Sequence, residues 1–378
     1  MSTDQEELKF VENRAAHLLS RPITVGGLTL PNRVAMAPMT RGFSPGGVPG
    51  ADVAAYYARR AAGGTGLVIT EGAYVGHPSA GQHDLVSRMY GDDALAGWAR
   101  VTGAVHDAGG RIFAQLQHVG MARAAGDPPH PEAPAIGPSG QPLEGTRTGH
   151  AMTQADIDAV LSAFAEAARD AERAGFDGVE LHGAHGYLID QFLWSGTNHR
   201  TDRYGGGVRA RARFAAEAVA AVRARVAPGF PVVVRVSQWK QSDYTARLAD
   251  TPEEFGVILG ELVDAGADAF HASTRRYWQP AFDGAELNLA GWAKKLTGKP
   301  AITVGSVGLD TEFTASLAGD TAGRTGIDGL LDRLEADEFD VVAVGRSLLA
   351  DPDWTAKILG GRDDDVIPFT PAALGVLG

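Results

Sequence analysis

Two histidines stand three residues apart in the segment 182–187, His-Gly-Ala-His-Gly-Tyr, and these residue types support two kinds of chemistry. The spacing of His182 and His185 is one at which imidazoles bind zinc or another metal, with Glu180 as a further ligand. Two neutral imidazole donors can instead hold a carbonyl oxygen while negative charge builds on it. Tyr187, two residues on, could then deliver a proton. A pair of purely structural histidines is the third interpretation.

A metal-dependent hydrolase usually takes ligands from several strands of its fold. The other expected strand ends of this chain offer neither a convincing third histidine nor a pair of carboxylates. The lack of further ligands favours a carbonyl clamp, in which His182 and His185 hold a carbonyl oxygen, over a metal site, but excludes neither.

Two glycine-containing pairs, Gly305-Ser306 and Gly345-Arg346, end the last two apolar runs of the sequence. Glycine lets backbone N–H groups approach an anion, and barrels often bind phosphate at the ends of their seventh and eighth strands. Arg346 adds a charged donor. Glycines that merely turn the chain are the alternative, but their occurrence at both strand ends favours a phosphate site.

Two polar residues lie inside otherwise apolar runs. Arg235 follows three valines, and a buried guanidinium has to meet an anion or several acceptors, whether in a structural ion pair or at the edge of an electron-rich ring. Gln115 can donate and accept at the amide-like edge of a heterocycle.

These residues need a scaffold, and the sequence alternates short apolar runs with segments of helical period. Short buried runs predict parallel strands, and eight such units predict a single α/β domain folded as a (β/α)₈ TIM barrel, with a doubly wound open sheet as the alternative. No Gly-x-Gly-x-x-Gly follows any strand, which favours the barrel. The expected strands are Arg33–Pro38, Leu67–Gly72, Ile112–His118, Gly178–Gly183, Val232–Ser237, Ala269–Ser273, Ala301–Ser306 and Val341–Arg346. The expected helices are Asp52–Ala62, Asp93–Ala108, Gln154–Ala174, Val208–Val226, Pro252–Ala265, Leu289–Leu296, Ile327–Ala336 and Trp354–Leu359.

Two long stretches interrupt this alternation. Gly120–Met152 is rich in proline and glycine and is expected to form a flap over the C-terminal face after strand 3. Gly308–Gly326 is a second insertion, after strand 7. Residues 1–20 and 361–378 are expected to be peripheral, so that 1–378 forms one domain.

The amino-acid composition limits the kinds of molecule that the protein is expected to bind. A formal net charge of −12 argues against nucleic acid and anionic membranes, which favour basic surfaces. The sequence holds no cysteine, which excludes disulfides, thiolate catalysis and cysteine-ligated metals. The polar, acidic N-terminus is no signal peptide and no apolar run reaches membrane-spanning length, so a cytoplasmic protein is expected. A homo-oligomer is one assembly consistent with the sequence.

Taken together, these residues resemble the old yellow enzyme family of flavin-dependent ene-reductases. The resemblance runs from about Leu19 to Leu359, and its most specific stretch is His182 to Gly206. Its landmarks, in order, are Pro31-Asn32-Arg33, the segment from Ala37 to Arg41, Thr70-Glu71-Gly72, Gln115-Leu116, His182 to Leu188, Asn198 to Gly206, and Gly345-Arg346.

The resemblance implies a non-covalent FMN at the C-terminal mouth of the barrel. Ala37, Pro38, Met39 and Thr40 would pass along the flavin, and Thr40 would hydrogen-bond the ring. Gly72 would lie at the ring edge, and Gln115 and Arg235 would hold the pyrimidine part. The phosphate would lie against Gly305, Ser306, Gly345 and Arg346.

The resemblance to this family also implies a reaction, the reduction of an activated carbon–carbon double bond. NADPH or NADH reduces the flavin, and a hydride then passes from FMN N5 to the β-carbon of an enone- or enal-type α,β-unsaturated carbonyl compound. His182 and His185 would bind the carbonyl oxygen, and Tyr187 would protonate the α-carbon, with no metal taking part. The alternatives are a metal-dependent TIM-barrel hydrolase using both histidines, a flavoenzyme that runs the reverse desaturation in a biosynthetic pathway, and a non-catalytic barrel that binds flavin or another ligand.

Two features depart from the family pattern. Thr40 replaces a cysteine found in part of the family, whereas His185 stands where threonine-bearing members often have asparagine, so the chain mixes the marks of two subgroups. The loop Thr274–Leu289 follows no family pattern and is expected to shape the substrate pocket.

Overall fold

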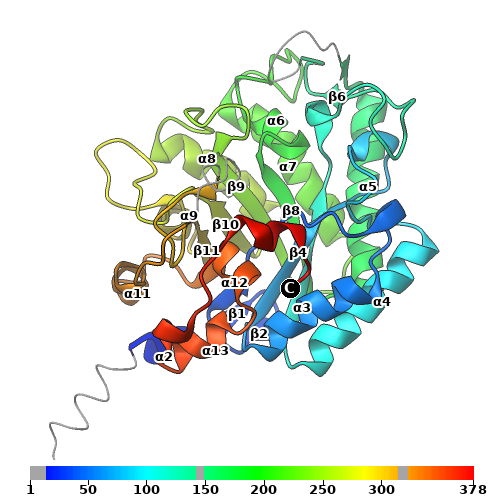
Figure 1. The fold of residues 1–378 in the computed structure, drawn as a ribbon. Helices are drawn as coiled ribbons and strands as arrows, with labels where there is room; N and C mark the ends of the chain where they lie inside the picture. The colour runs from blue at the N-terminus through cyan, green and yellow to red at the C-terminus, as the bar shows by residue number, and fades with distance from the viewer. Residues whose placement is uncertain (1–13, 142–148, 314–321) are drawn as a thin grey trace, which may run out of the picture.

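Eight parallel strands close into a barrel in the computed structural model, which describes residues 14–141, 149–313 and 322–378 (Figure 1). Around the barrel the strands follow one another in chain order, and β12 pairs with β3 to close it. The prediction of a TIM barrel is therefore confirmed, and an open doubly wound sheet is excluded. The barrel strands are β3 Val34–Met36, β4 Leu67–Tyr74, β5 Arg111–Gln117, β8 Gly178–His185, β9 Val232–Lys240, β10 Ala269–Ser273, β11 Ala301–Val304 and β12 Val341–Val344.

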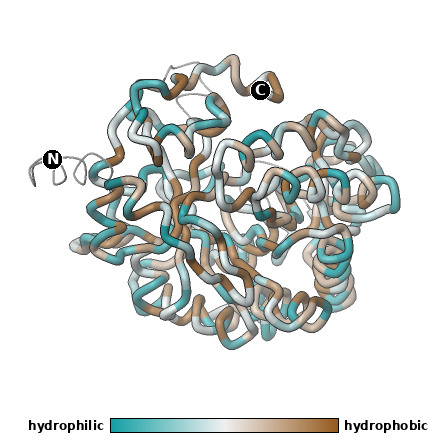
Figure 2. Tube along the Cα trace, turned by 90° about the horizontal axis from the view of Figure 1, so that it is seen from below, coloured by the Kyte–Doolittle hydropathy of each residue, from teal (hydrophilic) through white to brown (hydrophobic). Residues whose placement is uncertain are grey.

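The strands are buried on both faces, which explains why they appear in the sequence as continuous apolar runs. Side chains such as Ile69, Phe113 and Ile302 fill the barrel interior, and all three are fully buried. Figure 2 shows brown, hydrophobic stretches in the central part of the trace, whereas the surrounding helices alternate hydrophilic and hydrophobic residues.

Helices surround the barrel at nearly the positions that the periodicity predicts. Thr153 begins one of them with a capping box, in which its hydroxyl accepts from the Asp156 N–H and the Asp156 carboxylate accepts from the Thr153 N–H. Gly109, Gly175 and Gly266 follow helix ends with φ of 84°, 91° and 109°, the left-handed conformation expected there. The predicted helices are observed as α3 Ala51–Ala62, α4 Asp92–Asp107, α5 Gln154–Arg173, α7 Val208–Arg223, α8 Pro252–Asp264, α9 Leu289–Thr297, α11 Asp328–Glu335 and α13 Trp354–Leu359.

Several short strands and helices were not predicted from the sequence, because they are too short to show a periodic pattern of hydrophobic residues. The most informative is an antiparallel hairpin of β1 Ile23–Val25 and β2 Leu28–Leu30, whose side chains join the barrel interior. The Gly27 N–H donates to the Gly229 carbonyl, just before β9, so the hairpin closes the N-terminal end of the barrel. The other short elements are β6 Ile136–Gly137, β7 His150–Ala151, α2 Arg14–Leu19, α6 Leu188–Leu193 and α12 Arg346–Ala350.

The two expected insertions lie partly outside the described residues. In the first, β6 and β7 pair with each other. Arg123 is buried there and donates to the carbonyl oxygens of several loop residues, among them Ala133 and Pro128. In the second, Leu309 and Arg324 form an isolated antiparallel bridge. In the described part of the chain, no helix combines the length and apolar character needed to cross a bilayer.

The hairpin at the closed end of the barrel gives a stability prediction. Leu30 is fully buried, so Leu30→Ala should lower the free energy of unfolding by about 2 to 5 kcal/mol through lost apolar burial and a residual cavity. Urea unfolding followed by circular dichroism measures this loss. Thr29→Ala, at the exposed neighbouring position, is the control and should change stability by less than about 1 kcal/mol. Equal losses in the two variants would contradict the role given to the hairpin.

Candidate active site

A cavity of about 490 Å³ opens at the C-terminal ends of the barrel strands, the end at which TIM barrels bind their ligands. A volume of this size suits a small-molecule or cofactor site. Every site residue expected from the sequence except Gly72 lines it. These residues are Ala37, Pro38, Met39, Thr40, Gln115, His182, His185, Tyr187, Arg235, Gly305, Ser306, Gly345 and Arg346.

Gly72 lies behind the wall of the cavity. It pairs with Gln115 across the β4–β5 ladder. A Cβ atom at position 72 would fall 1.8 Å from Oε1 of Gln117, a residue that does line the cavity. The glycine therefore makes room for Gln117.

The motif 182–187 lies where β8 leaves the sheet. His185 has φ of 67° and Gly186 has φ of 85°, so two successive residues are left-handed, and the β8–β9 ladder changes register between Gly183 and His185. A left-handed histidine is strained and persists only when its surroundings fix it. The turn brings the three aromatic side chains together: the ring of His182 lies 5.0 Å from that of His185 and 4.9 Å from that of Tyr187, both edge to face.

A fully buried ion pair braces this turn. The Lys240 ammonium lies 2.8 Å from Asp190 Oδ1, and Asp190 Oδ2 accepts the Gly186 N–H at 2.6 Å. Burial raises the pKa of Asp190 above its usual value and lowers that of Lys240, although each charge opposes this effect on the other. Neither residue was predicted to take part in the site, because their contact joins α6 to the end of β9, fifty positions apart in the chain.

Both histidines are neutral. Burial, followed by the charge of Arg235, holds the pKa of His182 and of His185 well below the usual 6.5. Burial also raises the pKa of Tyr187 above 10, so its phenol keeps its proton. The group thus offers neutral imidazole donors and one protonated acid, as a carbonyl clamp requires.

The metal-site interpretation fits the geometry less well, because Glu180 is not available to the histidines as a ligand. Its Oε1 accepts from Gln115 Nε2 at 2.7 Å, and its Oε2 lies 2.7 Å from Nδ1 of the buried His271. Among the described residues, no group of three or more acidic or histidine side chains is arranged to hold a metal ion.

A buried charge network lies beside the histidines, and two of its members, Gln115 and Arg235, form the floor of the cavity. Arg235 stands opposite His182 in one ladder and opposite His271 in the other. Burial works against the charged form of Glu180, but His271, Arg235 and Gln115 together hold its pKa below the usual value. His271 was missed in the sequence, although it is a polar residue in an apolar run just as Arg235 is.

The floor presents unused hydrogen-bonding groups to the cavity. Arg235 Nε is buried and has no hydrogen-bond partner among the described residues. Gln115 donates to Glu180, which leaves its own carbonyl oxygen for a donor. The pyrimidine edge of a flavin carries both carbonyl oxygens and a ring N–H, so these two residues fit it.

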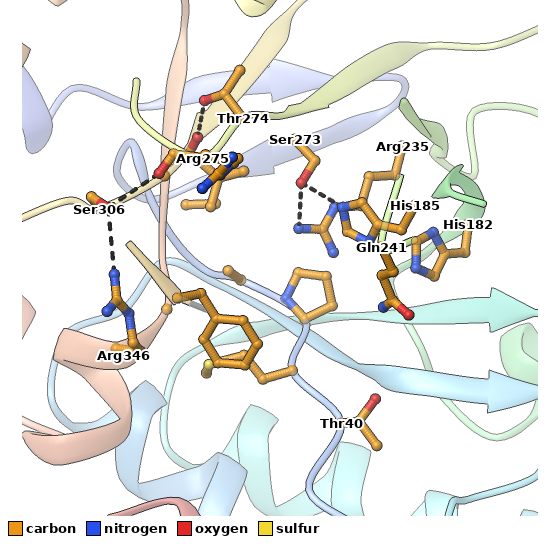
Figure 3. A pocket seen from close by; sticks show the side chains of 18 of the residues that line it. Thr40, His182, His185, Arg235, Gln241, Ser273, Thr274, Arg275, Ser306 and Arg346 are labelled. Carbon is orange, nitrogen blue, oxygen red and sulfur yellow. Dashed lines mark hydrogen bonds between the residues drawn. The ribbon is translucent and has the colours of Figure 1, made fainter. Parts of the chain in front are cut away.

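The residues that were expected to bind phosphate lie at the other end of the cavity. Gly305 has φ of 133°, and a Cβ atom there would lie 2.5 Å from the Thr274 carbonyl oxygen, so only glycine fits. Ser306 is left-handed, with φ of 49°, and its hydroxyl lies 3.4 Å from Arg346 Nη2 (Figure 3). Burial lowers the pKa of Arg346 to about 10, which leaves the guanidinium charged at neutral pH.

Several lining residues were not predicted from the sequence: Trp239, Gln241, Tyr244 and Ser273. Thr274 and Arg275, from the loop Thr274–Leu289, also reach the cavity, whereas Trp278 of that loop is 38% exposed. Leu374 lies in the wall as well, although residues 361–378 were expected to be peripheral.

The buried ion pair yields a prediction. Asp190→Asn leaves Lys240 charged and uncompensated in the interior, so we expect the free energy of unfolding to fall by about 3 to 5 kcal/mol. Removing both charges in Asp190→Asn/Lys240→Met should be less damaging than the single change. Thermal and urea unfolding measure both. Asp93→Asn, which disrupts the surface pair with Arg88, should leave stability nearly unchanged. A single variant no less stable than the double variant would contradict this account.

Several known proteins are similar to this chain. The NADH oxidase of Thermoanaerobacter brockii is 33% identical over 369 residues, which cover 94% of this chain and 52% of that protein. The chain thus spans about half the length of this relative. 12-Oxophytodienoate reductase 7 of Oryza sativa subsp. japonica is 32% identical over 358 residues, covering 90% of this chain and 87% of the relative. The structure of morphinone reductase superposes with a TM-score of 0.78 at 30% identity, covering 94% of this chain and 92% of the other.

The model of the NADH:flavin oxidoreductase / NADH oxidase family matches residues 18–365, nearly the whole described chain. The resemblance to old yellow enzymes is confirmed by this match and by the relatives. The chain therefore belongs to this family of flavin oxidoreductases, and FMN is its cofactor.

Proposed function

We propose that the chain is an ene-reductase, which reduces the carbon–carbon double bond of α,β-unsaturated carbonyl compounds. The observation that carries the proposal is the group of His182, His185 and Tyr187, two neutral imidazoles and a protonated phenol gathered at one cavity. The similarity to an oxophytodienoate reductase and to morphinone reductase supports the same class of substrate.

FMN would bind along the floor of the cavity. Arg235 and Gln115 would hold the pyrimidine edge, and Ala37 to Thr40 would run along the ring. Gly305, Ser306, Gly345 and Arg346 would bind the phosphate. When bound, FMN supplies the hydride that it has received from NADH or NADPH. The protein would position the substrate and stabilise the charge that develops on its carbonyl oxygen.

The substrate carbonyl oxygen would accept hydrogen bonds from His182 and His185. Nδ1 of His182 is buried without a partner among the described residues, as expected for a group that awaits a ligand. Donors already in place lower the energy of the enolate-like oxygen as charge develops. Tyr187 would then deliver its proton to the α-carbon, and Gln241 Nε2 lies 3.4 Å from the phenol oxygen.

The same geometry serves the reverse desaturation, because the clamp and the acid act on both directions of one reaction. We propose reduction as the physiological direction and FMN binding by the whole of 1–378 as one domain, with the segments 120–152 and 308–326 shaping access to the cavity. A cytoplasmic location and a homo-oligomeric state stay predictions from the sequence.

The clamp can be tested by mutation. His182→Ala removes one donor to the developing oxyanion, so kcat with 2-cyclohexenone should fall about 10²- to 10³-fold. Stopped-flow reoxidation of the reduced flavin isolates the step. The absorbance spectrum of bound FMN is the control, because His182→Ala should leave cofactor content unchanged. Enone reduction at the wild-type rate would refute the clamp, and a colourless wild-type protein would refute the flavin site itself.

The pKa shifts predict the pH profile. The folded-state pKa of each histidine lies well below 6.5, so lowering the pH to about 6.5 should not protonate either one. The pKa of Tyr187 lies above 10, so the acid stays protonated up to that pH. The rate of flavin reoxidation by enone should therefore be constant between about pH 6.5 and 9. A decline of the rate centred near pH 7 would contradict neutral donors.

A further inference from the structure

Ser273, the last residue of β10, lies between the floor of the cavity and the proposed clamp (Figure 3). Its hydroxyl oxygen is 3.2 Å from Nη2 of Arg235 and 2.7 Å from Nε2 of His185. The side chain is buried, with 2% of its residue surface exposed. No other hydrogen bond of this hydroxyl group is found within the described residues. The hydroxyl group has one proton, which it can donate to only one of these two neighbours.

The chemistry of the two neighbours decides where that proton goes. A guanidinium has only donors, so the Ser273 oxygen accepts from Arg235. The hydroxyl proton is then left for His185 Nε2, which has to be an unprotonated acceptor. Were Nε2 protonated, two donors would point at one oxygen and the hydroxyl proton would be left without an acceptor in the interior.

A neutral imidazole carries one proton, so the proton of His185 sits on Nδ1. Among the described residues Nδ1 has no hydrogen-bond partner, and the His185 ring lines the cavity. The free N–H of the ring is thereby available to a ligand. In the other tautomer, His185 would present an acceptor to the substrate oxygen, and the clamp would lose one of its two donors.

The backbone of the same residue also orients the ring. The Ser273 carbonyl oxygen accepts a hydrogen bond from Trp239 Nε1 at 3.2 Å. The Trp239 indole stacks on the His185 imidazole, with the ring centroids 4.4 Å apart and an angle of 24° between the ring planes. The backbone N–H of His185 donates to Ser237 Oγ at 3.0 Å, which stabilises the left-handed conformation of this residue. Ser273 therefore acts on the plane of the imidazole and on its protonated nitrogen at once.

We propose that Ser273 is a positioning residue that fixes His185 in the Nδ1–H tautomer and so supplies the second donor of the carbonyl clamp. It connects that donor to Arg235, which would contact the flavin. The role in catalysis rests on the proposed ene-reductase function. The tautomer itself does not, and can be measured without substrate.

The first test is nuclear magnetic resonance of the FMN-loaded full chain with ¹⁵N-labelled histidine. The resonances of His185 are identified by their loss in His185→Asn. In the wild type we expect Nδ1 to be protonated and Nε2 to be unprotonated. Ser273→Ala should shift the population towards Nε2–H, and Ser273→Thr, which keeps a hydroxyl, should retain the wild-type pattern. A wild-type His185 protonated on Nε2, or a pattern unchanged in Ser273→Ala, would overturn the proposal.

The second test is a double-mutant cycle with 2-cyclohexenone. Ser273→Ala should lower the rate of flavin reoxidation about tenfold, the value of one hydrogen bond, with FMN content unchanged. Asparagine has no tautomers, so in a His185→Asn background the same change should alter the rate less than twofold. An equal loss in both backgrounds would show that Ser273 does not act through His185.

The control removes a different buried hydroxyl. Ser44 is fully buried and its Oγ has no hydrogen-bond partner among the described residues. Ser44→Ala should leave both the tautomer and the rate unchanged. Should the wild type show the expected tautomer but turn over no enone, the proposed function fails while the assignment of Ser273 stands.

Discussion

The charge of Arg235, buried beneath the mouth of the barrel, is the constraint on which the rest of the site depends. A guanidinium in this position needs compensation, and Glu180 supplies it from the neighbouring strand. Glu180 in turn takes hydrogen bonds from Gln115 and contacts His271, so four strands contribute to one network. Burial, and after it the positive charge of Arg235, lowers the pKa of His182 and of His185, which keeps their rings neutral.

A second constraint is the left-handed backbone at His185. The Asp190–Lys240 pair and Ser237 hold the turn, and Ser273 and Trp239 hold the ring. Strain of this kind is tolerated because the surrounding contacts fix it from several sides. In the proposed clamp, His185 is thus a donor whose direction and protonation are set before any ligand enters, as in a preorganised oxyanion site.

The two ends of the cavity differ in how they would bind a ligand. At the end proposed for the flavin pyrimidine, the groups are side chains on strands: Gln115 from β5 and Arg235 from β9. At the end proposed for the phosphate they would be the Arg346 guanidinium and backbone groups of Gly305 and Ser306, where the close approach of the Thr274 carbonyl leaves no room for a Cβ atom at position 305. A barrel suits such a division, because rigid strands orient polar side chains and the loops after them expose backbone N–H groups.

The sequence by itself determined the eight barrel strands, the main helices and the polar residues at the strand ends, because buried parallel strands are continuous apolar runs and a polar residue among them is conspicuous. It therefore predicted Arg235, Gln115 and the His182–Tyr187 motif. It did not predict the β1–β2 hairpin, the Asp190–Lys240 pair, His271 or Ser273. Short elements carry no periodic signal, and these side chains acquire their roles from ladder register and burial. Only the tertiary structure decided that Gly72 stands behind Gln117, that Glu180 is bound to Gln115 and His271 rather than to His182 and His185, and that Nε2 of His185 contacts Ser273. Each of these depends on distances between strands that are far apart in the chain.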